Sequence, residues 1–207
     1  MSKFLVVAAN GKAGQKIVNE LIARDLDVTV AVRQANKTQA SQVIIKDLFE
    51  LTVSDVKNFD IVIDAFGAWA PEALQQHTTS LEHLAAILAP NARLVVVGGA
   101  GSLYLDASHM VALKDSSGFP DAFKPLASAM GEGLARLRIL DVDWTYISPA
   151  ADFVADGERK GHYVIEGEVF TTDDKGVSQI SYADYAMALV DIATSGRYQK
   201  ERLSVRW

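Results

Sequence analysis

The residues of this chain with the clearest chemical meaning lie in the short segment Ala8–Gly14. An apolar run precedes it and an amphipathic pattern follows it, which predicts a buried strand, a tight turn and a helix N-terminus. Unpaired N–H groups and the positive end of the helix dipole converge at such a turn and bind anions. Gly11 would let the backbone approach a diphosphate, Gly14 would let the helix pack on the strand, and Asn10 suits a left-handed or turn conformation.

Two interpretations of this turn remain open from its residues alone. It is either the diphosphate site of a dinucleotide or an ordinary strand–turn–helix connection that holds no ligand. Under the first interpretation, we expect the turn and the first helical residues to contact the diphosphate, namely Ala8, Asn10, Gly11, Lys12, Ala13 and Gly14.

The second predicted strand ends in Arg33 rather than in an acidic residue. An acid at this position would bind a ribose 2′-hydroxyl and select NAD, whereas an arginine accommodates a 2′-phosphate. We therefore expect a preference for NADP(H) over NAD(H), with Lys37 as a second cation; the alternative is a solvated surface arginine. Asp47 is expected to contact the adenine amino group or to cap a helix, and Leu48 beside it is expected to contact the cofactor.

Small residues also follow the next strands of the pattern. The fourth strand ends in Asp64–Ala68 and the fifth in Gly98–Ser102. In a doubly wound sheet these ends share one rim with the first turn, where a cofactor backbone could pass. We expect Ala65, Phe66, Gly67 and Gly98 to contact the cofactor there.

Strand-like and helix-like segments alternate along the chain, and most of the strands are apolar on both faces. This pattern predicts an α/β fold: a single doubly wound, Rossmann-like domain over residues 1–207, with a mostly parallel sheet and helices on both faces. We expect segment 150–180 to form a loop or hairpin over the site and Ser181–Asp184 to open a helix as a capping box. The predicted strands are 3–9, 27–33, 42–45, 60–66, 92–98, 144–148 and 202–207, and the main helices start near residues 12, 71, 121 and 181.

Composition and charge narrow the possible function. The 207 residues are 49% hydrophobic and 22% charged, and 20 basic against 26 acidic residues give a net charge of −6. No concentrated basic face is present, which argues against nucleic acid as a partner, and no apolar run is long enough to cross a membrane. The chain has no cysteine, so disulfides and thiolate metal sites are excluded, and no His or carboxylate spacing suggests a metal. We expect a cytoplasmic protein, monomeric or homodimeric, that acts on a small molecule.

The chain resembles the NAD(P)-binding, NmrA-like branch of the atypical short-chain dehydrogenase/reductases, a family with members described as NADH-flavin reductases. The segments that carry the resemblance are Asn10–Gly14, Ile63–Trp69, Val97–Tyr104, Ala122–Met130, Trp144–Phe153 and Ile180–Asp184. The resemblance implies Gly11 and Gly14 at the diphosphate, Arg33 at the 2′-phosphate, Asp47 near adenine and Ala65–Gly67 along the ribose. It also implies that Ser148, Pro149 and Ala150 lie near the nicotinamide.

The chain departs from the family pattern at two places. Ala8 stands where the family has the first glycine of the turn, which is tolerated if its φ stays negative. The Tyr-x-x-x-Lys pair of standard members, in which the tyrosine donates a proton, is absent, and Lys124 and Ser128 occupy its positions. The remaining candidates for catalysis are Ser102, Tyr104 and Lys124.

Three functions are compatible with these features. The first is an NADP(H)-dependent oxidoreductase that transfers hydride to a small planar acceptor such as a flavin or quinone, because such acceptors can take their proton from solvent. For this function we expect an acceptor pocket walled by Phe66, Trp69, Tyr104, Phe119 and Phe153. The second is a redox-sensing regulatory protein that binds NADP(H) without turnover. The third is an epimerase or lyase on the same scaffold, disfavoured because little chain remains for a large substrate.

Overall fold

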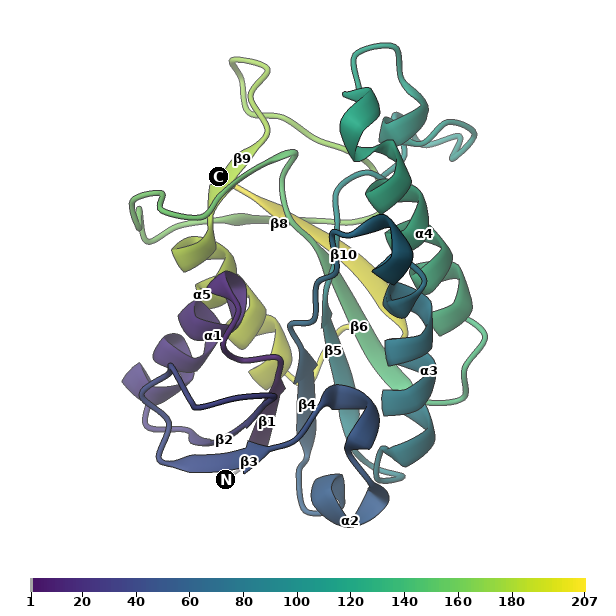
Figure 1. The fold of residues 1–207 in the computed structure, drawn as a ribbon. Helices are drawn as coiled ribbons and strands as arrows, with labels where there is room; N and C mark the ends of the chain where they lie inside the picture. The colour runs from purple at the N-terminus through teal and green to yellow at the C-terminus, as the bar shows by residue number, and fades with distance from the viewer. Residues whose placement is uncertain (1) are drawn as a thin grey trace.

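The computed structural model describes residues 2–207 and contains one large sheet and one small sheet. The large sheet has eight strands in the order β3-β2-β1-β4-β5-β6-β10-β8, all parallel except β8 (Figure 1). The expected doubly wound, mostly parallel α/β fold is confirmed. The strands of this sheet are β1 (Lys3–Val7), β2 (Asp27–Val32), β3 (Gln42–Ile45), β4 (Ile61–Asp64), β5 (Arg93–Val97), β6 (Asp143–Ser148), β8 (Val164–Glu166) and β10 (Glu201–Arg206).

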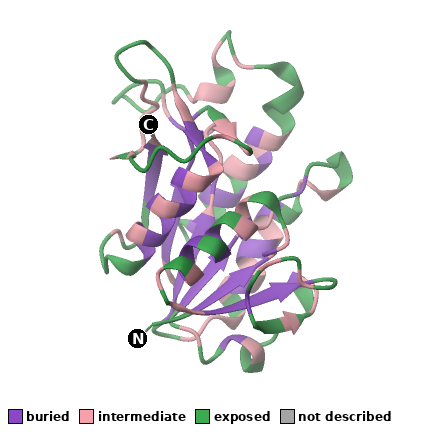
Figure 2. Ribbon diagram, turned by 90° about the vertical axis from the view of Figure 1, so that its left-hand side faces the viewer, coloured by how far each residue is buried: buried purple, intermediate pink, exposed green. Residues whose placement is uncertain are grey.

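Helices cover both faces of the sheet. Helices α1 (Lys12–Ala23) and α5 (Tyr182–Thr194) pack together on one face, and α3 (Gln76–Ile87) and α4 (Lys124–Leu137) pack on the other (Figure 1). Alternate residues of β1 enter the two cores: Phe4 and Val6 face α1 and α5, whereas Leu5 and Val7 face the other layer. Figure 2 shows the central strands buried and the outer helix faces exposed, as expected for a sheet covered on both sides. The edge strands β3 and β8 are more exposed.

The strand order reverses between β1 and β4. From β1 the chain proceeds outward through β2 and β3, and it then returns to place β4 on the other side of β1. The register pairs Val7 with Asp64, so the turns that follow the two strands start side by side. Ligands of doubly wound sheets bind in the crevice outside this switch point.

Two predicted helices begin later than expected. The pattern from Pro71 first forms a short 3₁₀ helix, Pro71–Ala73, and α3 starts at Gln76. The pattern from Asp121 likewise forms a 3₁₀ helix, Asp121–Phe123, before α4. In α4 a proline lies in the first turn, where its missing N–H costs nothing. A short helix, α2 (Val53–Val56), lies between β3 and β4.

Segment 150–180 contains short strands that pair with other elements. Strand β7 (Asp152–Val154) pairs in parallel with β9 (Gln179–Ser181), and β8 pairs antiparallel with β10. Strand β10 therefore lies inside the sheet, between β6 and β8. No helix within residues 2–207 has both the length and the apolar character that a membrane crossing requires.

The start of α5 corrects the predicted capping box. Ser181 caps the helix, because its Oγ accepts a hydrogen bond of 3.0 Å from the Asp184 N–H. The Asp184 carboxylate does not return this bond to the Ser181 N–H. It accepts instead from the N–H groups of Lys160 (2.8 Å) and Gly161 (2.9 Å) and from the Trp207 indole (2.7 Å). A buried carboxylate thus joins α5, segment 150–180 and the C-terminal end of the chain.

Candidate functional site

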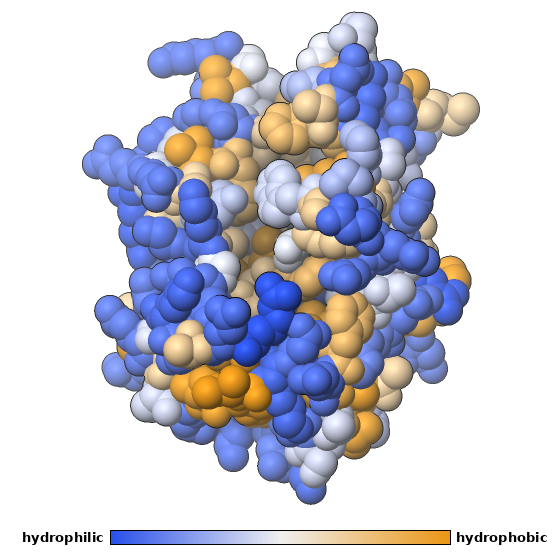
Figure 3. Space-filling view, viewed as in Figure 1, coloured by the Kyte–Doolittle hydropathy of each residue, from blue (hydrophilic) through white to orange (hydrophobic). Residues whose placement is uncertain are grey.

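A cleft of about 530 Å³ lies at the carboxyl ends of β1, β2 and β4. Its volume falls in the range of small-molecule and cofactor sites. Figure 3 shows this side of the molecule hollowed between the half with α1 and α5 and the half with α3 and α4. Of the residues predicted to contact a cofactor, the following line the cleft together: Ala8, Asn10, Gly11, Arg33, Asp47, Leu48, Ala65, Phe66 and Gly67.

The first turn adopts an unexpected conformation at Ala8. Its φ is +57°, in the left-handed region, whereas the sequence interpretation required a negative φ for an alanine there. Asn10 lies in the turn, but its φ is not positive. The left-handed bend lets the Gly11 N–H donate a 3.1 Å hydrogen bond to the Ala8 carbonyl, which closes the turn. The turn keeps its tight geometry at the cost of strain in a residue with a Cβ.

Replacement of the strained alanine should stabilise the protein. We expect Ala8→Gly to raise the free energy of unfolding by about 1 kcal/mol, because glycine adopts a positive φ without the Cβ penalty. Urea unfolding of both proteins measures the change. The matched control is Ala13→Gly, in the first turn of α1, which should lower stability by up to about 1 kcal/mol because glycine weakens a helix. An Ala8→Gly variant less stable than the wild type would show that the alanine is not strained.

The two glycines of the turn differ in what surrounds them. A Cβ at Gly14 would lie 2.8 Å from both the Cα and the carbonyl oxygen of Ala9, so only glycine lets α1 pack this closely on the end of β1. A Cβ at Gly11 would meet only the Ala8 carbonyl, at 3.4 Å. Gly11 has φ −67° and ψ 161°, which any L-residue can adopt. The fold therefore requires Gly14, whereas the space beside Gly11 opens on the cleft.

The N-terminus of α1 is free to receive an anion. Gly11 is the N-cap residue, no side chain caps the helix, and the first turn contains no acidic residue. The first N–H groups of a helix lack partners within it, and the helix dipole adds a partial positive charge. Lys12 and Ala13 contribute to this turn through their backbone and are not cleft-lining residues.

Asn10 has a role that sequence reasoning missed. Its Nδ2 donates a 2.9 Å hydrogen bond to the Ala35 carbonyl, and its Oδ1 accepts a 2.8 Å bond from the Lys37 N–H. The side chain thereby fixes the loop after β2 against the first turn. Both Arg33, at the end of β2, and Lys37, in this loop, are brought to the cleft wall.

Arg33 and Asp47 form a loose ion pair in the wall of the cleft. The Arg33 Nε lies 3.9 Å from the Asp47 Oδ2, and the arginine side chain is 79% exposed, so this pair contributes little to stability. Asp47 caps the 3₁₀ helix Leu48–Glu50, because its Oδ1 accepts a 3.0 Å hydrogen bond from the Phe49 N–H. Of the two expected roles for Asp47, the structure shows the cap. Lys46 also lines the cleft but is paired with Asp55 at 2.8 Å.

The predicted catalytic side chains do not line the cleft. The Ser102 Oγ accepts a 3.2 Å hydrogen bond from Arg202, a buried arginine that is ion-paired with Glu168. Tyr104 stacks on His109, with ring centroids 4.5 Å apart. Lys124 is exposed and pairs with Asp121 at 2.7 Å. The structure thus gives each of the three a partner outside the cleft.

The expected nicotinamide end of the site lies at the ends of β5 and β6. Ser148, Pro149 and Ala150 are buried and, like Gly98, do not line the cleft; the Ser148 Oγ has no hydrogen-bond partner. The packing of the sheet requires a glycine at position 98, because a Cβ there would overlap the Tyr146 ring.

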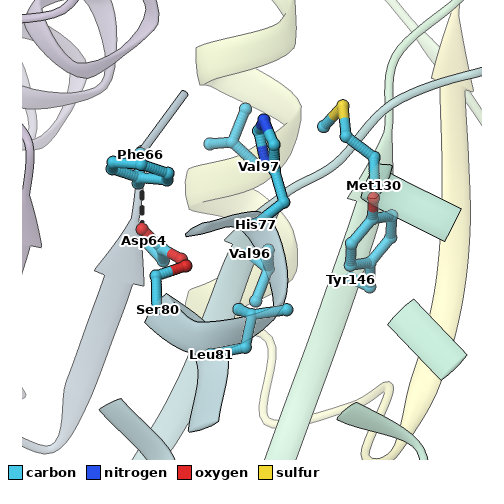
Figure 4. A pocket seen from close by; sticks show the side chains of 9 residues that line it. All are labelled: Asp64, Phe66, His77, Ser80, Leu81, Val96, Val97, Met130 and Tyr146. Carbon is cyan, nitrogen blue, oxygen red and sulfur yellow. Dashed lines mark hydrogen bonds between the residues drawn. The ribbon is translucent and has the colours of Figure 1, made fainter. Parts of the chain in front are cut away.

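A small cavity of about 10 Å³ lies below the cleft, on the α3–α4 side of the sheet. It is lined by Asp64, Phe66, His77, Ser80, Met130 and Tyr146 together with Leu81, Val96 and Val97 (Figure 4). Burial raises the pKa of Asp64 to about 6, against the opposing effect of a hydrogen bond from the Phe66 N–H. Phe66 lines both the cavity and the cleft. The only sequence signal for this feature is an aspartate that ends an apolar strand, which sequence reasoning did not weigh.

Comparisons with known proteins agree with this geometry. The model of the NAD(P)H-binding family matches residues 8–195, so the chain belongs to that family. The resemblance to NAD(P)-binding atypical short-chain dehydrogenase/reductases is confirmed. Within residues 2–207 no group of three or more histidine or acidic side chains is placed to hold a metal ion.

Three relatives illustrate the range of proteins that are similar to this chain. YwnB of Bacillus subtilis (strain 168), an uncharacterised protein, is 43% identical, and the alignment covers 98% of this chain and 97% of YwnB. The crystal structure of SP1627 from Streptococcus pneumoniae TIGR4, a candidate NADH-flavin reductase, is 50% identical with a TM-score of 0.97, covering 100% and 99% of the two chains. A candidate epimerase from Bacteroides thetaiotaomicron is 29% identical with a TM-score of 0.87, covering 100% and 97%.

Proposed function

We propose that the protein is an NADP(H)-dependent oxidoreductase that transfers hydride to a small planar acceptor such as a flavin or quinone. The observation that carries the proposal is the cleft itself. An uncapped helix N-terminus forms one part of its wall, and Arg33 at the end of β2 and Lys37 in the following loop line it as well. The similarity to SP1627 supports the reaction class. This function fits the departure from the Tyr-x-x-x-Lys pattern, because a flavin or quinone can take its proton from water.

Different parts of the cleft bind different parts of the coenzyme. The open amides of the first helical turn hold the diphosphate, and Gly11 allows it to approach. Ala65–Gly67 form the wall along the ribose, and the nicotinamide end lies toward Ser148–Ala150, as the family resemblance implies. The coenzyme itself supplies the hydride, and the protein orients it and limits the access of water. Neither Ser102, Tyr104 nor Lys124 is required to deliver a proton in this scheme.

The coenzyme preference gives a direct test of the assignment of Arg33. We expect Arg33→Ala to weaken NADPH binding about 10- to 100-fold and NADH binding less than about twofold, because the guanidinium pairs only with the 2′-phosphate. Calorimetry with both coenzymes measures the two effects. Arg136→Ala is the control, since this arginine on α4 pairs with Glu82 and does not line the cleft. Equal losses of affinity for NADPH and NADH would show that Arg33 does not bind the 2′-phosphate.

A second candidate function is a redox-sensing regulator that binds NADP(H) without turnover. The placement of the predicted catalytic side chains outside the cleft favours it. Steady-state oxidation of NADPH with a panel of flavins and quinones distinguishes the two candidates. Turnover with at least one acceptor is expected from the oxidoreductase, whereas tight coenzyme binding with no turnover on the whole panel would support the regulator.

A further inference from the structure

Asp64 is a buried acid that the proposed function does not use. It ends β4 and is 3% exposed, and its Oδ1 accepts a 3.0 Å hydrogen bond from the Phe66 N–H. This bond fixes the start of Ala65–Gly67, the segment that forms one wall of the cleft. The Asp64 side chain also lines the small cavity, where it and Ser80 point toward one another (Figure 4). The cavity of about 10 Å³ has room for about one water molecule.

Within residues 2–207 no cation is paired with the Asp64 carboxylate. The titratable groups that share its cavity are His77 on α3 and Tyr146 on β6. His77 bonds the Ala68 backbone, and burial lowers its pKa, which favours the neutral ring. Burial raises the pKa of Tyr146 to about 12, so the phenol is neutral as well. Arg202, the register partner of Tyr146 on β10, is already paired with Glu168.

A carboxylate is a costly choice for this position. An asparagine could accept the same bond from Phe66 without ever placing a charge in the core. Burial raises the pKa of Asp64 to about 6, so the group changes charge near neutral pH. Fixing the turn does not by itself explain why a buried, unpaired acid occupies this position, which indicates a second role.

We propose that Asp64 positions the cleft wall Ala65–Gly67 and takes up a proton from solvent when a nicotinamide dinucleotide binds. The proposal rests on the proposed coenzyme site. Before binding, the protein is free and Asp64 is ionised. Binding combines this protein with the coenzyme and one proton, and the complex contains Asp64 as a neutral carboxyl group.

The register of the sheet supplies the physical reason. Asp64 pairs with Val7, the residue directly before Ala8, so the first turn and the segment Ala65–Gly67 start side by side. A diphosphate bound at the first turn would add negative charge at the same edge of the sheet as Asp64. Like charges in a region of low dielectric constant favour the neutral form of the acid. By linkage, a group that gains a proton on binding makes the coenzyme bind more tightly as the pH falls.

Calorimetry with NADP⁺ tests this inference. Titrations at pH 6 in buffers of different ionisation enthalpy give the number of protons taken up per NADP⁺ bound. This number should be larger for the wild type than for Asp64→Asn, by up to about half a proton. The titration of the 2′-phosphate is common to both proteins and cancels in this comparison. Between pH 8 and pH 5.5 the wild type should also gain about three- to tenfold more affinity than the variant. Equal uptake in the two proteins would overturn the proposal.

Two matched variants separate Asp64 from the rest of the cavity. Ser80→Ala should retain the proton uptake, because it changes the same cavity without removing a titrating group. Uptake that persists in Asp64→Asn and disappears in His77→Gln would assign the proton to His77 instead. Failure of NADP⁺ to bind any of the proteins would overturn the proposed coenzyme site itself, together with this inference.

A measurement on the wild type alone covers the case in which Asp64→Asn does not fold. Infrared difference spectra at pH 7, with and without NADP⁺, should show a gain in the carbonyl stretch of a protonated carboxyl group. No such gain, with coenzyme bound, would contradict the proposal. If the variant folds, it should also melt several degrees above the wild type at pH 8 and close to it at pH 4, because only the ionised form of Asp64 is destabilising.

Discussion

Gly11→Asp is expected to lower the affinity for NADP(H) by about 100-fold or more while the protein remains folded. The new carboxylate would stand at the N-cap of α1, next to the amides that receive the diphosphate. Two like charges would then compete for one helix N-terminus in a cleft partly shielded from water. The fold should tolerate the change, because a Cβ at Gly11 meets only the Ala8 carbonyl at 3.4 Å and aspartate is a favourable N-cap residue.

The control for this variant separates charge from bulk. Gly11→Asn has nearly the same size and caps a helix equally well, but it carries no charge. Calorimetry should show a clearly smaller loss of affinity for Gly11→Asn than for Gly11→Asp, and thermal unfolding should show both to be at least as stable as the wild type. Undiminished NADPH binding by a folded Gly11→Asp protein would mean that the diphosphate lies elsewhere.

Asp184→Ala is expected to destabilise the protein by about 3–5 kcal/mol, because it removes a buried hydrogen-bonded charge. The carboxylate is fully buried and accepts bonds from the backbones of Lys160 and Gly161 and from the Trp207 indole. Its loss would leave these three donors without a partner. The Lys160 ammonium group, 3.3 Å from the centroid of the Trp207 ring, would also lose its fixed position.

The effect of Asp184 should depend on pH with a defined sign. Burial alone would raise the pKa of Asp184, but the hydrogen bonds from Lys160, Trp207 and Gly161 outweigh it and hold the pKa below its usual value. Stabilisation by this group is therefore complete above the unfolded-state pKa and is lost as the pH falls through the folded-state pKa. Urea unfolding should show a large difference between wild type and Asp184→Ala at pH 7 and a smaller one at pH 3.

Asp174→Ala is the control for Asp184→Ala, since Asp174 is exposed in a turn. Its stability should stay within about 0.5 kcal/mol of the wild type at both pH values. If Asp184→Ala were equally mild at pH 7, the carboxylate would not be the link between α5, segment 150–180 and Trp207 that the structure describes.

The fold was predictable because its elements follow strong periodic patterns. The apolar strands and the stripes of α1 and α4 indicate a parallel sheet with two helical layers, which the structure has. The exact starts of α3 and α4 were not predictable, because the 3₁₀ turns Pro71–Ala73 and Asp121–Phe123 carry the same residue pattern as a first helical turn. The pairing of β8 with β10 depends on contacts between distant segments, which local patterns do not encode.

The site was predictable where backbone geometry alone defines it. Small residues at Ala8, Gly11, Ala65 and Gly67 indicated the cleft, because strand ends of a doubly wound sheet share one rim. The positions of the side chains predicted for catalysis could not be predicted in this way. The position of Tyr104, for example, depends on packing against His109 and on a bridge to Val169. The positive φ of Ala8 and the burial of Asp64 likewise arise from the three-dimensional context.

A crystal structure of the protein with NADP⁺ tests the central claim most directly. We expect the diphosphate to lie within hydrogen-bond distance of the backbone amides of residues 11–14, and the 2′-phosphate to lie beside the Arg33 guanidinium. A coenzyme bound outside the cleft, with the N-terminus of α1 facing only solvent, would contradict it.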